Sequence, residues 1–346
     1  MIHPIPYIVM LLLIGLSDPA LAGAGVTYSK PGKEIDLSLR KEVHRINGEV
    51  LDAVKSRDIA LLRKYMTDEF QKLKDEDTLA FINQLAPVID QVKLTQHYDN
   101  HVTSTFMGDG HISVNSETTP RFIVIIQFPN GRATEMAQEY FISQLITSGM
   151  PEDLILTLIY KKENNKWKVN NINAGLYAVH SKKLHDWYEE LKGIRESGDL
   201  ITSTLLLTQI KRLIRPAPFV IYQDEKAIIE YAKTVETEFN KTIRLPYKLD
   251  VKNDPTIFHI EMPVDIRAKD FYYVIKYLSK VPLEDTVSLN KEVDDMARVI
   301  AVKFPNFASQ QRQTVFLAFN EMPNDSKKSY KRFGMPRNLS ELSNKN

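Results

Sequence analysis

Apolar residues in the first part of the chain recur at the spacing of helices. A stripe with steps of three and four residues runs over residues 43–54, which predicts an amphipathic helix capped by Asp36. A second helix is expected from Ile59. A third, over residues 79–85, should end by Pro87, because proline lacks the backbone N–H that a helix interior uses. Three helices therefore precede any strand.

The pattern then changes to that of antiparallel strands. Pro129-Asn130-Gly131 follows an almost unbroken apolar run with the residues of a tight turn, so the runs on either side are expected to pair as a hairpin. Glu163-Asn164-Asn165 predicts a second hairpin in the same way, and Gly108-Asp109-Gly110 predicts a further turn. The expected strands cover residues 92–103, 111–115, 122–128, 134–145, 154–160 and 167–177.

A second set of helices and strands follows. Proline residues and alternating apolar and polar positions mark the limits of each element. Helices are expected at residues 184–194, 205–214, 228–239 and 271–278, and strands at residues 243–251, 258–266, 298–304 and 314–319. From Asn324 onward the chain is polar and basic with little apolar periodicity, which predicts a disordered tail.

The chain is therefore expected to be an α+β protein, with N-terminal helices packed on a curved antiparallel sheet and a second α+β module after it. Its 346 residues are more than one ordinary core accommodates. We expect the following division: a signal peptide at residues 1–22, a first α+β domain at 30–180, a second at 181–323 and a disordered tail at 324–346.

The first residues resemble a secretory signal. Residues 5–16 are apolar, and Ala20-Leu21-Ala22 has the small residues that signal peptidase requires. The apolar run is too short to cross a bilayer, which takes about 20 residues, so an uncleaved anchor or a buried segment is the weaker alternative. We expect cleavage after Ala22 and a periplasmic or secreted protein that has no membrane attachment once the signal is removed.

Composition removes several kinds of chemistry and of partner. The chain has no cysteine, which excludes disulfides, thiolate nucleophiles and lipid-modified cysteine. A formal charge of +1 provides no field for nucleic acid. The basic residues Lys211, Arg212 and Arg215 form a small cluster that could contact an anionic partner, although solvated helix-end cations are the simpler interpretation. Neither a glycine-rich phosphate loop nor a Gly-x-Ser-x-Gly elbow is present, and no cofactor is expected.

Two segments carry a resemblance to a known superfamily. Residues 47–73, NGEVLDAVKSRDIALLRKYMTDEFQKL, contain a helix, a short break and a second helix with a D-E-F ending, and the hairpin YKKENNKWKVNNI follows later. Together they resemble the nuclear-transport-factor-like, cystatin-like fold. The resemblance covers less than half of the chain and implies a curved sheet around an N-terminal helix, with a pocket between them that serves isomerases, dehydratases, cyclases and non-enzymatic binding domains.

One group of polar residues is a candidate for chemistry. In a strand over residues 95–103, alternation places His97, Asp99 and His101 on one face, and His111 is expected to join them after the next turn. This set suits a His–Asp acid–base site or a transition metal. The simpler interpretation places the three residues on a solvent-facing side near a sheet edge. His44, beside the first apolar stripe, is interpreted as a surface residue.

Two functions remain open from the sequence. The first is an exported, non-catalytic binding or scaffolding protein for a protein or small-molecule ligand in the periplasm or outside the cell. The alternative is a small-pocket isomerase, dehydratase or cyclase with His97, Asp99 and His101 as acid–base residues. The sequence determines neither the ligand nor the oligomeric state.

Overall fold

The structure is a computed structural model that describes residues 27–91, 93–104, 108–114, 122–128, 138–148, 152–265, 270–310, 312–325 and 328–343. The chain forms two compact units. The first contains the residues up to Lys183 together with Arg212–Glu225, and the second contains Leu184–Lys211 and the residues from Lys226 onward. Both units combine helices with a sheet, which confirms the predicted α+β class.

Helices at the start of the first unit follow the apolar pattern. They are α1 (Leu37–Lys55), α2 (Ile59–Tyr65) and α3 (Asp75–Gln91). Asp36 caps α1 as predicted, since its carboxylate accepts hydrogen bonds from the backbone N–H groups of Ser38 and Leu39. The predicted end of the third helix at Pro87 is wrong. The helix continues through it because buried residues before and after the proline, such as Leu85 and Ile89, offset one missing backbone hydrogen bond.

The main sheet of the first unit has six antiparallel strands. In spatial order they are β1 (Thr27–Pro31), β2 (Lys93–Ser104), β5 (Gln138–Ser148), β6 (Glu152–Glu163), β7 (Lys166–Val179) and β8 (Lys182–Lys183). The predicted hairpin between β6 and β7 is confirmed. Its two turn residues, Asn164 and Asn165, have φ of 50° and 60°, as a two-residue hairpin turn requires.

A second, three-stranded sheet corrects the other predicted hairpin. It consists of β3 (Gly108–Val114), β4 (Phe122–Phe128) and β9 (Val220–Tyr222), with β4 in the middle. The prediction paired β4 with the strand after it, but that strand, β5, pairs with β2 and β6. The predicted turn at Gly108-Asp109-Gly110 is also wrong, because these residues are the first of β3. Residues 129–131, the predicted hairpin turn, lie outside the described residues.

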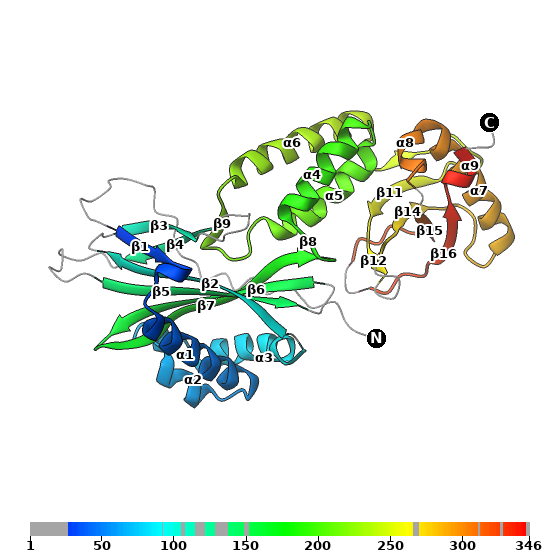
Figure 1. Cartoon of the computed structure of the whole chain (residues 1–346). Coiled ribbons are helices and arrows are strands. Elements are labelled where there is room, and N and C mark those ends of the chain that lie inside the picture. The colour runs from blue at the N-terminus through cyan, green and yellow to red at the C-terminus, as the bar shows by residue number, and fades with distance from the viewer. Residues whose placement is uncertain are drawn as a thin grey trace. The chain divides into compact units, whose positions relative to one another are not determined.

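The curled sheet of the first unit has apolar layers on both faces. Helices α1, α2 and α3 cover one face, and β3, β4 and β9 lie on the opposite side (Figure 1). On β5, Phe141 and Leu145 belong to the core under the helices, while Tyr140 and Ile142 point to the other face. Phe122 of β4 packs against that other face, where its ring centroid lies 6.2 Å from Tyr177 of β7.

The second unit begins with helices and continues into a five-stranded sheet. Its helices are α4 (Leu184–Glu196), α5 (Leu200–Leu213), α6 (Glu225–Thr242), α7 (Thr286–Lys303), α8 (Pro305–Ala308) and α9 (Ser340–Ser343). The sheet order is β10 (Tyr247–Lys248), β11 (Thr256–Glu261), β14 (Tyr273–Leu278), β15 (Gln313–Phe319) and β16 (Phe333–Asn338), and β12 (Val264–Asp265) pairs with β13 (Asp270–Phe271). Among the described strands of this unit, β14 and β15 alone run parallel, and α7 lies between them in the chain.

Two elements of the second unit differ in type from the prediction. The segment predicted as a helix over residues 271–278 contains strand β14, whose residues are buried on both faces and whose apolar run does not distinguish a strand from a helix. The strand predicted at residues 298–304 is instead the end of helix α7. Buried Leu289, Val293, Met296 and Ile300 recur there at helical spacing and pack on the sheet.

The predicted disordered tail is also wrong over part of its length. Strand β16 pairs with β15 along six residue pairs, from Gln313–Asn338 to Ala318–Phe333. An edge strand has only one neighbour, so it needs little apolar alternation to be ordered, and only Met335 of β16 is buried. No helix in the described part of the chain is long and apolar enough to span a membrane.

Candidate functional site

Two of the three predicted site residues lie on one face of β2, and that face is covered by helices. Asp99 is only 5% exposed, so the interpretation of a solvent-facing strand is wrong for this residue. His101 shares the face and contacts Trp167 of the helix-side core with ring centroids 5.9 Å apart. The side chains of His97 and His111 lie outside the described residues, and the metal and acid–base hypotheses for them stay predictions.

Asp99 contacts His44, the histidine that the sequence pattern assigns to the surface. Nε2 of His44, on α1, lies 2.7 Å from Oδ2 of Asp99, on β2. The two side chains differ in exposure: 33% of the histidine is accessible to solvent, against 4% of the aspartate. A buried carboxylate thus holds a partly exposed imidazole. The interpretation of His44 as surface decoration is wrong because it faces the sheet beside the apolar stripe of α1.

A chain of buried hydrogen bonds approaches Asp99 from the other side. The Ser143 hydroxyl donates to Oδ1 of Asp99 at 3.0 Å, the Asn47 amide donates to Ser143 Oγ at 2.9 Å, and the Tyr160 hydroxyl donates to Asn47 Oδ1 at 2.6 Å. Each donor in this series is directed to the next residue along the path to Asp99. Burial raises the pKa of Tyr160 well above its ordinary value, and the charge of Asp99 acts in the same direction.

This network assigns the roles of the two imidazole nitrogens. Both oxygens of Asp99 accept hydrogen bonds, as expected of an ionised carboxylate. In neutral His44 the proton must therefore reside on Nε2, which donates to Asp99, and the lone pair resides on Nδ1. The tautomer follows from the donor directions of the network.

A second polar group lies further along the same face of β2. Nε2 of His101 lies 3.2 Å from Oε2 of Glu139, and Nζ of Lys162 donates to Oε1 of the same glutamate at 2.9 Å. Burial alone would raise the pKa of Glu139, but the hydrogen bonds from Lys162 and His101 outweigh it and hold that pKa below its ordinary value. Lys162 also lies 5.7 Å from the Trp167 ring centroid. His101 is thus engaged in an ion-pair cluster.

A metal site needs several histidine or carboxylate side chains around one point. Within the part of the chain that the structure describes, no group of three or more His, Asp or Glu side chains is placed to hold a metal ion. The contacts of Asp99 are those of a hydrogen-bonded carboxylate, with one histidine and one serine around it. A histidine hydrogen-bonded to a buried carboxylate is an arrangement suited to proton transfer.

The residues that sequence reasoning missed do carry a signal. Asn47 belongs to the buried face of α1, where a polar amide among valines and isoleucines needs a buried partner. His44 precedes it by three residues and so lies on nearly the same side of the helix. The pattern that predicts such a site is a polar pair on the inner edge of an amphipathic helix together with an acidic residue on a predicted strand.

The basic residues at the end of α5 have acidic partners. Lys211 contacts Glu236, and Arg212 contacts Glu152. Arg215 donates to Glu225 Oε1 through Nε at 2.9 Å and Nη2 at 2.6 Å. These cations are neutralised by glutamates, so the interpretation as purely solvated helix ends is incomplete.

The first unit defines a class of protein: an α+β fold in which a helix supplies a histidine and the curved sheet beneath it supplies a buried aspartate. No family model, no curated protein and no solved structure matches the chain.

Proposed function

We propose that the chain performs acid–base chemistry on a small substrate, with His44 as the proton acceptor and Asp99 as the carboxylate that orients it. The observation that supports this function is the 2.7 Å contact between Nε2 of His44 and Oδ2 of Asp99. Burying an ionised carboxylate is costly unless it is fully hydrogen-bonded, and here both oxygens are bonded. A base oriented by a second group is the arrangement that general-base catalysis uses.

The proposed step is a reversible proton transfer. Nδ1 of His44 takes a proton from a carbon next to a carbonyl group, the electron pair of that C–H bond becomes an enolate, and the imidazolium is balanced by Asp99. The proton is then returned to the same or a neighbouring atom. Isomerisation, dehydration and cyclisation all begin in this way and need no oxidant or cofactor. The resemblance to the nuclear-transport-factor-like superfamily, where such enzymes occur, is consistent with this proposal.

Hydrogen–deuterium exchange tests the step without knowledge of the substrate. The full-length protein is incubated in D₂O with a panel of small ketones, aldehydes and keto acids, and loss of the α-proton signal is followed by NMR. We expect faster exchange of at least one compound. His44→Gln should lower this rate about 100-fold or more, the usual contribution of a general base, and Asp99→Asn should lower it because it no longer holds the required tautomer.

His259→Gln is the matched control, since His259 is exposed on β11 in the second unit. It should exchange the panel compounds at the wild-type rate. Far-ultraviolet circular dichroism of each variant establishes that it is folded. An equal exchange rate in His44→Gln, or no exchange of any panel compound by the wild-type protein, would contradict the proposal.

A second candidate function is an exported binding protein. It is supported by the N-terminal residues, which resemble a secretory signal. In either case export remains a proposal that rests on the N-terminal residues. Mass spectrometry of protein isolated from the periplasm or medium should find Gly23 as the first residue, and recovery of the unprocessed chain from the cytosol alone would contradict export.

A further inference from the structure

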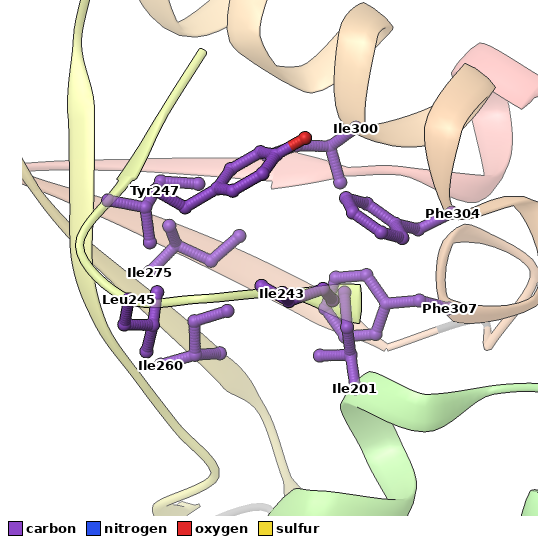
Figure 2. A pocket seen from close by; sticks show the side chains of 10 residues that line it. Ile201, Ile243, Leu245, Tyr247, Ile260, Ile275, Ile300, Phe304 and Phe307 are labelled. Atoms are coloured by element: carbon purple, nitrogen blue, oxygen red, sulfur yellow. The ribbon is translucent and has the colours of Figure 1, made fainter. Parts of the chain in front are cut away.

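Apolar side chains of the second unit surround a small hollow, which Figure 2 shows from close by. Its walls include Ile243, Ile300 and Phe307, each of which is buried. The free space inside is about that of one water molecule, so a hydrocarbon ligand does not fit. The polar side chains on the helix-side face of β2, in the first unit, are the better candidates for contact with a ligand.

The face of β2 that carries Asp99 has a second histidine–carboxylate pair. Nε2 of His101 lies 3.2 Å from Oε2 of Glu139, and Nε2 of His44 lies 2.7 Å from Oδ2 of Asp99. Asp99 and His101 are two positions apart on the strand, so their Cα atoms are about 7 Å apart and their side chains share one face. The side chain of His101 is 18% exposed and that of His44 is 33% exposed, so a small molecule can reach both rings.

The two carboxylates differ in the charge of their second hydrogen-bond donor. Asp99 accepts its second hydrogen bond from the neutral hydroxyl of Ser143. Glu139 accepts its second one from the ammonium group of Lys162, at 2.9 Å. The charge of Asp99 is thus available to stabilise an imidazolium at His44, whereas the charge of Glu139 is already balanced by a cation.

Positive charges lie on two sides of His101. Lys162 shares the carboxylate of Glu139 with it, and Lys30 of β1 is its partner in the strand register, which places both side chains on one face of the sheet. On a further side the ring packs against Trp167, with ring centroids 5.9 Å apart. Because like charges repel, a proton on His101 is passed to a substrate more readily than a proton on His44.

We infer that His101 is the proton donor in the reaction proposed for His44. His44 takes the proton from the carbon next to a carbonyl group, the electron pair of that C–H bond forms a C=C bond, and the carbonyl oxygen takes a proton from His101. The product is a neutral enol, and the reverse steps return the protons. This inference rests on the proposed function, and it narrows the substrate to a small ketone or aldehyde whose carbonyl oxygen contacts His101.

Butanone and nitroethane are probes of nearly the same size that differ in their need for a proton donor. Loss of an α-proton from nitroethane leaves a charge that the nitro group spreads over two oxygens. The enolate of butanone is far more basic and needs a proton on its oxygen. In the deuterium-exchange experiment, His101→Gln should lower the rate for butanone about 100-fold or more and the rate for nitroethane less than about threefold. His44→Gln should lower both rates.

A second variant separates the loss of a proton donor from the loss of packing. His101→Phe keeps an aromatic ring against Trp167, where the histidine ring lies in the wild-type protein. It should show the same contrast between butanone and nitroethane as His101→Gln. His259→Gln, at an exposed position of β11, should exchange both probes at the wild-type rate.

Replacing Lys162 tests the electrostatic part of the inference. In Lys162→Met the charge of Glu139 is no longer shared, so it holds the proton on His101 more strongly. The pH above which butanone exchange declines should therefore rise by about half a unit or more. Lys161→Met is the matched control, because Lys161 lies on the same strand but contacts Glu163, at 3.7 Å. It should leave the profile unchanged, and an unchanged profile in Lys162→Met would contradict the role of His101.

The outcomes distinguish this inference from the proposed function. If His44→Gln slows both probes while His101→Gln slows both equally or neither, His44 remains the base and His101 is not the proton donor. A wild-type protein that exchanges nitroethane but not butanone also overturns the donor. Exchange of neither probe by the wild-type protein, or wild-type rates in His44→Gln, overturns the proposed function and this inference with it.

Discussion

At the scale of single residues, the polar side chains around Asp99 are the least expected feature of the first unit. Asn47, Ser143 and Tyr160 are each at most 2% exposed, although they lie in the core between helix and sheet. The three side chains form a series in which each one donates a hydrogen bond to the next, and the last donates to Asp99. Such a network is stable only while every member is present, since a buried polar group without a partner costs about 1–3 kcal/mol.

Replacing Asn47 with leucine tests how much the network contributes to stability. Asn47→Leu has a similar size but leaves the Tyr160 hydroxyl and Ser143 Oγ without their present partner. We expect the free energy of unfolding to fall by about 1–3 kcal/mol for each such group, measured by urea denaturation. Asn240→Leu, at an exposed position of α6, should change it by less than about 0.5 kcal/mol. Equal stabilities of the two variants would contradict the network's role.

Glu261 on β11 provides a test of pH dependence. Hydrogen bonding to His259 and then to Lys276, partly opposed by burial, lowers the pKa of Glu261 to about 2 from an ordinary value of 4.5. A depressed carboxyl pKa stabilises the fold above pH 4.5, and this contribution is lost as the pH falls from 4.5 toward 2. Because the side chain is 38% exposed, solvent screening limits the contribution to less than about 1 kcal/mol.

Glu261→Gln should therefore be less stable than the wild-type protein at pH 7, and the difference should shrink between pH 5 and pH 3. Thermal unfolding of both proteins at several pH values measures it. A difference that stays constant down to pH 3 would mean that the carboxylate charge is not the cause.

At the scale of elements, one glycine permits a close crossing of two segments. A Cβ on Gly175 of β7 would lie 1.5 Å from the backbone carbonyl oxygen of Pro216. The segment between α5 and α6 thus lies against the strand where a side chain is absent. Any other residue at this position would place its Cβ against backbone atoms of Pro216. A backbone segment cannot move aside as a flexible side chain would.

We expect opposite effects from two glycine-to-alanine changes in the first unit. Gly175→Ala should lower the free energy of unfolding by about 1–3 kcal/mol through overpacking. Gly48→Ala, on the exposed side of α1 with nothing within 4 Å of the new methyl group, should raise it by about 0.5–1 kcal/mol through helix propensity. Chemical denaturation measures both, and a neutral Gly175→Ala would disprove the close crossing.

At the scale of the whole molecule, the two units share the chain in alternation. The chain passes between them after Lys183, after Lys211 and after Glu225. The middle segment returns to the first unit and adds β9 to the three-stranded sheet. Val220 and Tyr222 of β9 are buried there, so the first unit completes its core with residues that follow two helices of the second.

A chain that ends at Lys183 should consequently be unstable. It lacks β9, and the edge of β4 and its buried Phe122 are then uncovered. We expect a lower unfolding midpoint and a tendency to aggregate. A synthetic peptide of residues 212–225 added in trans should restore the midpoint, whereas a peptide with Val220→Asp should not. Full stability of the short chain without a peptide would show that β9 is dispensable.

The sequence alone was sufficient for elements whose signals are local. Helix α1 with its cap at Asp36 and the hairpin across Asn164 and Asn165 were predicted correctly, because periodicity and turn chemistry act over a few neighbouring residues. Local signals also predicted the first and last residues of β4 correctly. They did not predict which strands pair with it. The type of β14 and α7 was mistaken because a short apolar run is compatible with helix and strand alike.

The candidate site required the tertiary structure. Asp99 and His101 were singled out by alternation along one strand, but the partner of Asp99 is His44, 55 positions earlier in the chain. Which strands become neighbours, and which helix covers them, depends on how all apolar surfaces are buried together, and no local pattern records that choice. The residues of the chain thus determined the elements and their faces, whereas only their packing brought a histidine to a buried carboxylate.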